Sequence, residues 1–191
     1  MKTIYTTIGA SNHSDTIREE YDFYATFPEA IDRLLEVETF SDTIWEPACG
    51  MGHLSERMIK LGKTVYSTDL INRGYGIGGF DFLKAAENTH GDIITNPPYK
   101  VTMEFIEKAL TISGEGTKIA MFLKLTFLEG KRRKPFFQTN PPQKIHIFSS
   151  RAVVAKSGDF TAAQINENAI AYAWFVWEKG YKGNTVVDWI N

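Results

Sequence analysis

Thr43-Ile44-Trp45-Glu46-Pro47-Ala48-Cys49-Gly50-Met51-Gly52-His53 passes from a short apolar run through a glycine turn into an amphipathic segment. The apolar run predicts a β-strand, and Leu54, Met58 and Leu61 then recur on one helical face. The two glycines of the turn carry no Cβ, so the backbone can approach a ligand closely there. The stretch therefore predicts a strand, a turn and a helix, with a ligand site at the turn.

The same alternation continues along the chain. Apolar runs that end in a polar residue recur at 64–68 and 92–95, and further runs lie at 119–125, 144–148 and 169–177. Amphipathic segments separate several of them, and Thr26-Phe27-Pro28-Glu29 predicts a helix start with Thr26 as its cap. We predict one α/β domain over residues 1–191, with a mostly parallel, seven-stranded, Rossmann-like sheet and helices on both faces.

Composition sets limits on the class of protein. The 191 residues are 43% hydrophobic and 23% charged, which excludes an intrinsically disordered chain. The formal net charge is −2, which also excludes a uniformly basic nucleic-acid coat protein. The longest apolar run, 169–177, is too short to cross a membrane, and the single cysteine cannot form an internal disulfide. We expect a cytoplasmic protein without a membrane partner.

An acidic residue follows each of the first two predicted strands. Asp69 lies 23 residues after Glu46, a distance that suits a carboxylate accepting the hydroxyls of a ribose. Ser55 stands where a dinucleotide-binding turn has its third glycine, so a nucleoside without phosphates is favoured over NAD. A plain tight turn with Asp69 as a helix cap is the alternative. Asp81 and Phe82 suit an adenine amine and ring, although Phe82 is equally typical of a core position.

The turn Asn96-Pro97-Pro98-Tyr99 directly follows the third predicted strand. Consecutive prolines fix the backbone, so the Asn96 amide oxygen and the Pro97 carbonyl become rigid acceptors. Two N–H groups of a planar amine bound there would favour a pyramidal, nucleophilic nitrogen. Tyr99 offers an aromatic face for a planar substrate. A surface turn is the alternative interpretation.

Five segments, in order, resemble the S-adenosylmethionine-dependent adenine-N6 DNA methyltransferases, particularly small phage-type members with gamma-like motif order: 24–28, 46–52, 67–70, 81–82 and 96–99. The resemblance implies a class I methyltransferase fold, S-adenosyl-L-methionine as cofactor and catalysis by Asn96, Pro97, Pro98 and Tyr99 on a flipped adenine. It implies that Asp69 binds the cofactor ribose and Asp81 its adenine. The cofactor residues that it implies are Tyr24, Thr26, Phe27, Glu46, Ala48, Cys49, Gly50, Gly52, Asp69, Leu70, Asp81, Phe82 and Asn96.

Positive charge is concentrated in one segment. Nine of the 21 Lys and Arg residues lie between Lys118 and Lys156 with one of the 23 Asp and Glu residues, giving +8 there and −10 elsewhere. Basic and aromatic residues alternate in a predicted loop at 126–143, as in loops that grip phosphates, although a solvated charged face is the alternative. We predict nucleic-acid contacts, with DNA or RNA, by Lys124, Lys131, Arg132, Arg133, Lys134 and Phe136.

Several features leave other activities open or disfavour them. The four histidines and Cys49 show no metal-ligand spacing, so no metal is expected. A turn like Asn96-Pro97-Pro98-Tyr99 also occurs in RNA base methyltransferases and in protein glutamine methyltransferases, so these activities are alternatives. A non-catalytic protein with the cofactor-binding fold is a third possibility. Residues 1–20 are expected to form an arm and residues 149–168 a lid or a surface loop; the oligomeric state is left open.

Overall fold

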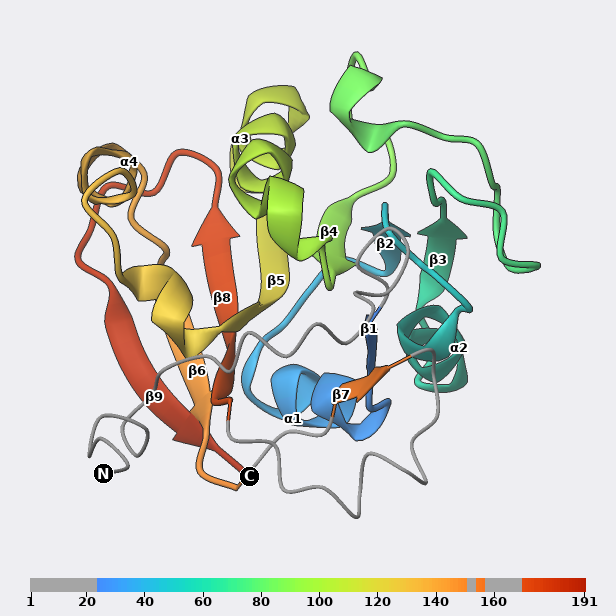
Figure 1. Cartoon of the computed structure of the whole chain (residues 1–191), viewed down its shortest axis with the longest axis horizontal. Coiled ribbons are helices and arrows are strands. Elements are labelled where there is room, and N and C mark those ends of the chain that lie inside the picture. Colours follow the sequence, from blue (N-terminus) through green and yellow to red (C-terminus); the bar gives the residue numbers. More distant parts are fainter. Residues whose placement is uncertain (1–23, 151–153, 157–169) are drawn as a thin grey trace, which may run out of the picture.

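A seven-stranded sheet forms the centre of the molecule (Figure 1). The computed structural model describes residues 24–150, 154–156 and 170–191. The strand order is β3-β2-β4-β5-β8-β6-β9, and only β8 runs against the others within this sheet. The strands are β2 (Thr43–Glu46), β3 (Thr64–Ser67), β4 (Asp92–Thr95), β5 (Lys118–Lys124), β6 (Lys144–Phe148), β8 (Tyr172–Glu178) and β9 (Val186–Ile190). The predicted mostly parallel, seven-stranded sheet is confirmed.

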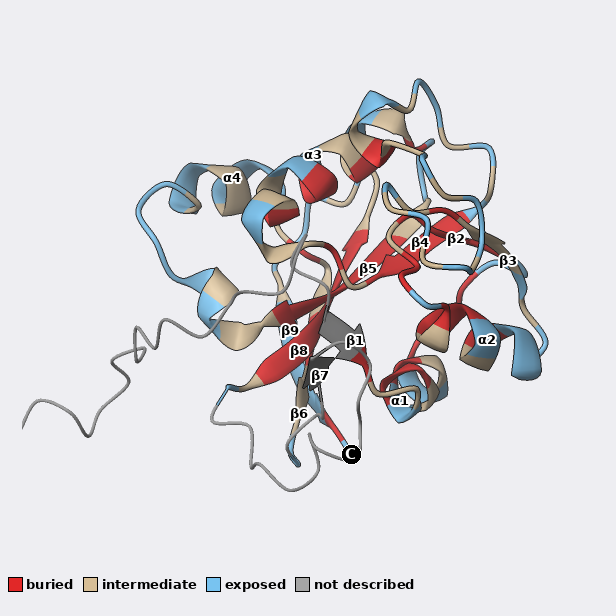
Figure 2. Cartoon of the chain, turned by 45° about the vertical axis from the view of Figure 1, so that its right-hand side comes forward, coloured by how far each residue is buried: buried red, intermediate tan, exposed pale blue. Residues whose placement is uncertain are grey.

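Helices cover both faces of the sheet, as predicted. On one face α1 (Glu29–Val37) and α2 (His53–Lys60) bury a cluster that includes Phe122, whereas α3 (Thr102–Ile112) and α4 (Lys134–Thr139) pack with Met121 on the other. The alternation arises because successive side chains of a strand point to opposite faces. Both faces of β5 and β8 are therefore buried, and the burial in Figure 2 follows the middle strands.

Three expectations from the sequence need correction. Thr26 does not cap α1: it ends the strand β1 (Tyr24–Thr26), and Pro28 is the N-cap residue of the helix. The range 126–143 is not only a loop, because it holds most of the short 3-10 helix η5 (Leu125–Leu128) and all of α4. The edge strand β9 was missed, since Val186, Val187 and Trp189 are exposed and give no buried alternation.

The arm expected at 1–20 and most of the lid or surface loop expected at 149–168 lie outside the described residues. Within the latter, β7 (Val154–Lys156) pairs antiparallel with β1 in a separate two-stranded sheet. No helix in the described ranges is long and apolar enough to span a membrane.

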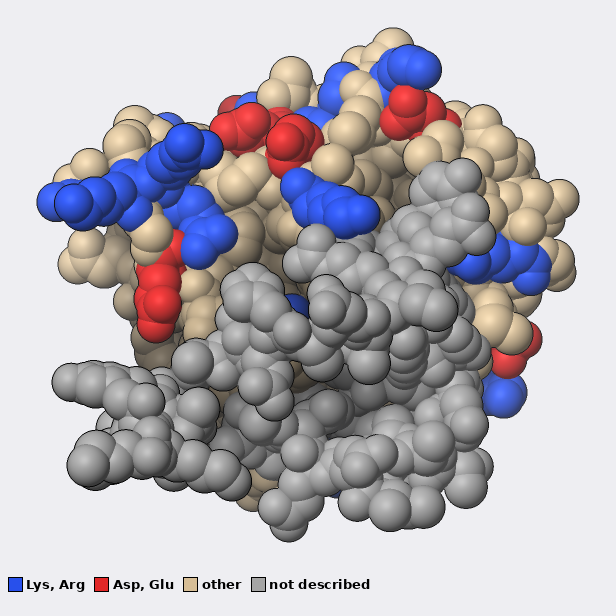
Figure 3. Space-filling model, viewed as in Figure 1, with Lys and Arg blue, Asp and Glu red and all other residues tan. Residues whose placement is uncertain are grey.

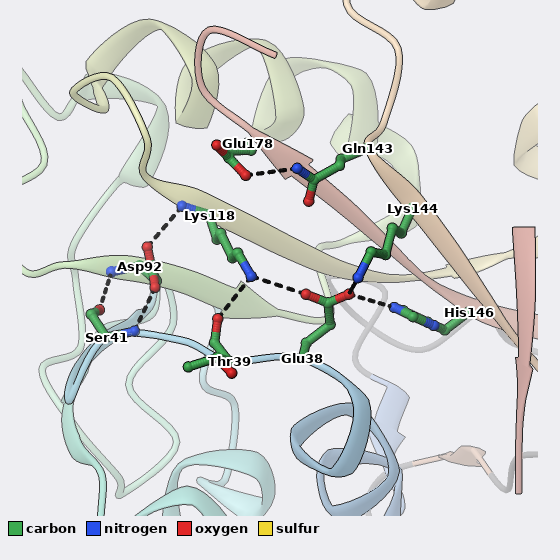
Figure 4. A network of polar contacts seen from close by, with 9 residues as sticks. All are labelled: Glu38, Thr39, Ser41, Asp92, Lys118, Gln143, Lys144, His146 and Glu178. Carbon is green, nitrogen blue, oxygen red and sulfur yellow. Dashed lines mark hydrogen bonds and ion pairs between the residues drawn. The ribbon is translucent and has the colours of Figure 1, made fainter. Parts of the chain in front are cut away.

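The amino ends of β4, β5 and β6 carry a polar network (Figure 4). Glu38, whose side chain is 1% exposed, contacts Lys118 Nζ at 3.0 Å, Lys144 Nζ at 2.6 Å and His146 Nε2 at 3.0 Å. Beside it, the Asp92 carboxylate accepts the backbone N–H groups of Ser41 and Lys118, each at 2.7 Å. Both buried carboxylates are thus hydrogen-bonded, which joins the α1–β2 connection to three strands.

Candidate active site

The turn after β2 is tied to the end of β3 through Asp69. The Asp69 carboxylate accepts the backbone N–H of Gly50 at 2.8 Å and that of Ile71 at 2.8 Å, one on each oxygen. The Cys49 N–H donates to the Thr68 carbonyl at 3.0 Å. A carboxylate has about four acceptor positions, so Asp69 retains acceptors for a further donor such as a ribose hydroxyl.

Glu46 ends β2 and is 2% exposed. Burial raises the pKa of its carboxyl to about 8, a hydrogen bond from the Ser55 hydroxyl opposes this rise, and the negative charge of Asp69 adds to it. Among the described residues, no Lys, Arg or His forms an ion pair with it. The carboxyl is therefore mostly protonated at neutral pH. It lies beside the turn that we predicted from the sequence to bind a ligand.

Tyr75 belongs to this site and was missed from the sequence. A Cβ built on Gly52 would lie 2.5 Å from three atoms of the Tyr75 ring, so the ring covers the second glycine of the turn. Burial raises the pKa of the Tyr75 hydroxyl, and interaction with Ser55 and Ser67, whose own hydroxyls are 2.6 Å apart, opposes this rise. One signal was present: Ser55 stands between Leu54 and Met58 on the apolar face of α2, where a polar side chain needs a buried partner.

Three exposed apolar side chains belong to the segments that are hydrogen-bonded to Asp69 or follow it. Leu70, which follows it, is 56% exposed, Met51 in the turn is 47% exposed, and Ile77, bridged to Thr68, is 50% exposed. Exposed apolar groups beside a carboxylate suit a ligand with a flat ring and hydroxyl groups. Ala48, also predicted to contact a cofactor, is half-buried in the same turn.

Asp81 and Phe82 take different positions from each other. Phe82 is 2% exposed and packs edge-on against Trp45, with ring centroids 5.1 Å apart, so it is a core residue in this structure. Asp81 accepts the Leu83 N–H at 3.1 Å and contacts Lys84 Nζ at 3.2 Å. The carboxylate remains half-buried, while the ring of Phe82 has no exposed face for an adenine.

The first predicted cofactor segment lies beside α2. Thr26 is buried, and its hydroxyl has no hydrogen-bond partner among the described residues; the same holds for Thr95, at the end of β4. Buried hydroxyls normally have a partner, so these two groups mark places for a ligand or a water molecule. Phe27 is half-buried, and Tyr24 pairs through its backbone with Lys156.

The Asn96-Pro97-Pro98-Tyr99 turn extends from the carboxyl end of β4, in the sheet next to β2. Pro98 is extended, with φ −59° and ψ 130°, and Tyr99 begins a short 3-10 helix, η4 (Tyr99–Val101). The Thr102 hydroxyl donates to the Pro98 carbonyl at 3.1 Å, and the Tyr99 and Tyr172 hydroxyls lie 3.1 Å apart. The turn is thus held from α3 and from β8.

The predicted nucleic-acid residues fall into two groups. Lys124 ends β5 and its Nζ lies 4.3 Å from the centroid of the Tyr99 ring, and the half-buried Arg133 lies over Phe127. Phe136 packs against the core. Lys131, Arg132 and Lys134 are exposed, and Figure 3 shows Lys and Arg side chains gathered over α4 and the loop before it.

Other chemistry finds less support in the described residues. Burial, together with the charges of Glu46 and Asp69, raises the pKa of the Cys49 thiol to about 12, so a thiolate nucleophile is disfavoured. Within the described ranges, His, Cys, Asp and Glu side chains form no group of three or more that could hold a metal ion.

Comparison with solved structures places this arrangement in a known fold. A protein assigned as an RNA methyltransferase from Pyrococcus horikoshii superposes with a TM-score of 0.57 at 14% identity, covering 83% of this chain and 87% of that one. A modification subunit assigned to a type I restriction enzyme from Vibrio vulnificus gives a TM-score of 0.57 at 13% identity, covering 87% and 46%. A protein assigned as a class I S-adenosylmethionine-dependent methyltransferase from Listeria monocytogenes gives 0.54 at 11% identity, covering 83% and 61%.

The chain has the class I methyltransferase fold. It spans less than two thirds of the Listeria and Vibrio proteins. A scan against protein-family models finds no match, and a search of curated proteins finds no relative. At these low identities the likeness concerns the fold, so the chemistry must be argued from the residues of the site.

Proposed function

We propose that this chain is an S-adenosylmethionine-dependent methyltransferase that methylates the exocyclic N6 amine of adenine in DNA. The observation that carries the proposal is the rigid Asn96-Pro97-Pro98-Tyr99 turn at the end of β4. β4 lies next to β2 in the sheet, and the turn after β2 carries the acidic residues. In open α/β sheets, ligands bind beyond the carboxyl ends of the strands, so the two turns would face one cleft.

The residues of the β2 turn fit this cofactor. Asp69 has acceptors left for the ribose hydroxyls, and the exposed Leu70 offers an apolar surface to the adenine. The buried Thr26 hydroxyl and the Glu46 carboxyl are candidates for the polar end of the methionine part. A cation bound beside Glu46 would lower the pKa of that carboxyl and favour its ionised form. When bound, S-adenosylmethionine supplies an electrophilic methyl group.

The turn after β4 would prepare the amine. The Asn96 side-chain oxygen and the Pro97 carbonyl accept the two N–H groups, which localises the nitrogen lone pair and stabilises the positive charge that develops during attack. Tyr99 holds the base by stacking, worth about 1–3 kcal/mol. The methylated nitrogen then loses a proton readily, so the site needs no strong general base.

The basic segment supports nucleic acid as the class of substrate, and its charge of +8 does not separate DNA from RNA. RNA is the second candidate, favoured by the same segment. A protein glutamine substrate is less favoured because a peptide substrate gives no reason for basic side chains gathered beside the turn.

The decisive variant is Asn96→Ala. We expect methyl transfer to DNA to fall by about 100-fold or more, because one of two acceptors for the amine is lost, while S-adenosylmethionine binding measured by calorimetry changes little. Asn184→Ala is the matched control, since its exposed side chain lies outside the site. Equal methylation rates for Asn96→Ala and the parent protein would contradict the mechanism.

The acceptor is identified by mapping modified bases after expression in a methylation-deficient host. N6-methyladenine in the host DNA, lost in the Asn96→Ala strain, is the expected result. Unmodified DNA with newly methylated RNA would transfer the proposal to RNA. No heat of binding with S-adenosylmethionine would instead favour a non-catalytic protein with this fold.

A further inference from the structure

A small cavity adjoins Tyr99 on the side of β5 and α3. Its volume is about 150 Å³, and its lining consists of Tyr99, Thr102, Leu123, Lys124, Thr126, Phe127 and Arg133. At roughly 30 Å³ for each water molecule, this space would hold about five waters, which is enough for a group with four oxygen atoms. Among the residues that the structure describes, the lining includes two cations, two threonines and no acidic residue.

Arg133 is held in position before any ligand binds. Its Nε donates to the Glu129 carbonyl at 2.6 Å and its Nη2 to the Thr126 carbonyl at 3.4 Å, and the guanidinium carbon lies 4.7 Å from the Phe127 ring centroid. These two hydrogen bonds use two of the five N–H donors of a guanidinium. No described Asp or Glu forms an ion pair with it, so a preorganised cation with spare donors lines the cavity.

Phe127 anchors this arrangement to the core. Its ring meets Phe137 edge-on at 5.9 Å and Phe175 at 6.2 Å, so the surface under Arg133 belongs to the packed face of the sheet. Arg133 is thereby fixed by the short η5 helix and its packing. An immobilised arginine loses less entropy on binding than an exposed lysine does.

Lys124 reaches the same cavity from the end of β5. Its Nζ lies 4.3 Å from the Tyr99 ring centroid, an interaction worth about 0.5–1 kcal/mol at an exposed site. A base that stacks on this face of Tyr99 would take the place of the ammonium group. Lys124 also lines the cavity, so the displaced ammonium group can contact an anion there.

The cavity is linked to the reaction turn through Thr102. The Thr102 hydroxyl donates to the Pro98 carbonyl at 3.1 Å, and α3 begins at the same residue. The amino end of a helix carries partial positive charge, which adds to that of the two cations. A ligand in the cavity would thus lie next to whatever occupies the face of Tyr99.

We propose that this cavity binds the phosphodiester group adjacent to the nucleotide whose base stacks on Tyr99. Arg133 is the fixed donor and Lys124 is the second cation. The inference rests on the proposed function only in taking nucleic acid as the substrate. It separates Arg133 and Lys124 from the exposed Lys131 and Arg132, which do not line the cavity and would attract nucleic acid without selecting one phosphate.

The experiment removes the charge of one phosphate group of the DNA and, separately, the charge of one side chain of the protein, and asks whether the two changes affect binding independently. A short single-stranded DNA with one adenine is prepared with a methylphosphonate in place of each phosphate in turn, and binding is measured by fluorescence anisotropy with S-adenosylmethionine present. We expect one position next to the adenine to weaken binding to the parent protein about tenfold. In Arg133→Gln, affinity for the unmodified strand falls by a similar factor. A methylphosphonate at that one position then causes no further loss of affinity.

Control variants distinguish the cavity from general charge. Lys131→Gln should weaken binding yet keep the full effect of that position, and Lys60→Gln on α2 should behave as the parent. Arg133→Lys keeps the charge without the planar pair of donors and should lie between the parent and Arg133→Gln. Thermal unfolding of each variant identifies any loss of folding, in which case Lys124→Gln, whose Nζ contacts a ring, provides the same comparison.

The outcomes separate this inference from the proposed function. Equal sensitivity to every methylphosphonate position in the parent and Arg133→Gln would overturn the cavity proposal even if DNA is methylated. Coupling between Arg133 and one phosphate, in a protein that methylates neither DNA nor RNA, would keep the cavity and reject the activity. Absence of binding to any nucleic acid would overturn both.

Discussion

Glu38 and Glu46 are two buried glutamates at opposite ends of the same sheet, and their surroundings differ completely. Glu38, at the amino ends of β5 and β6, contacts two lysines and a histidine. Glu46, at the carboxyl end of β2, has the Ser55 hydroxyl and, among described residues, no cationic partner. Burial favours the protonated form of both, but hydrogen bonds from His146, Lys144 and Lys118 lower the pKa of Glu38 to about 2, whereas that of Glu46 rises to about 8.

The difference indicates that the amino end of the sheet has a structural role and the carboxyl end is suited to a ligand. At the amino end each buried acidic group is satisfied by the protein itself, which adds order and stability. At the carboxyl end Glu46 has a hydroxyl but no cation beside it, and the buried Thr95 hydroxyl has no partner within the described residues. His146 Nδ1 at the amino end also lacks a partner among these residues, so the two ends differ mainly in the charge that surrounds their buried carboxyl groups.

The largest effect is expected for Glu38→Gln. Removing this charge leaves the ammonium groups of Lys118 and Lys144 without their counter-ion beside the buried His146, and we expect the free energy of unfolding to fall by about 3–5 kcal/mol near pH 7. Urea unfolding measures the change. Glu36→Gln, which removes an exposed pair with Arg33 at 3.0 Å, should cost less than about 0.5 kcal/mol.

The same substitution has a defined pH dependence. The pKa of Glu38 falls from 4.5 to about 2 on folding, so its stabilisation is complete above pH 4.5 and is lost as the pH falls toward 2. The parent should therefore lose its advantage over Glu38→Gln in that window. An unchanged difference between pH 7 and 2 would show that the network does not act through the charge of Glu38.

Glu46→Gln should show the opposite trend. Folding raises the pKa of Glu46 from 4.5 to about 8, so the folded state is favoured while the carboxyl is protonated and loses stability as the pH rises through this range. Glutamine cannot ionise, so the variant should gain about 3 kcal/mol relative to the parent between pH 4.5 and 7. Parallel stability curves for the two proteins would show that Glu46 does not hold a proton on folding.

The architecture was predictable because strands of one buried sheet have a strong sequence signal. The apolar runs before Glu46 and Asn96 and the long run at β8 correspond to strands, and their alternation with amphipathic segments predicts helices on both faces. β9 was not predictable in the same way. Its Val186, Val187 and Trp189 are exposed at the edge of the sheet, so neither alternation nor burial marks them.

The candidate site was predictable where chemistry depends on local sequence. The turn after β2, Asp69 and the proline turn each follow a strand directly, so the fold alone brings them to one edge. Tyr75 lies in a glycine-rich loop without periodicity, and its contact with Gly52 depends on the path of that loop. Phe82 was ambiguous because an aromatic residue after a turn suits a ligand or a core equally, and tertiary packing selected the core.

The smallest expected effect concerns two glycines, Gly52 and Gly62, and tests whether Tyr75 is part of the candidate site. Gly52 and Gly62 both have left-handed backbone, with φ of 87° and 90°, but a Cβ at Gly52 meets the Tyr75 ring whereas a Cβ at Gly62 meets nothing within 4 Å. Gly62→Ala should cost about 1 kcal/mol from the backbone alone. Gly52→Ala should cost about 1 kcal/mol more, since the ring must shift. Calorimetry should then show weaker S-adenosylmethionine binding for Gly52→Ala only, because the displaced ring lies over the turn after β2, where we propose that the cofactor binds. Equal stability and equal affinity in the two variants would exclude Tyr75 from the site.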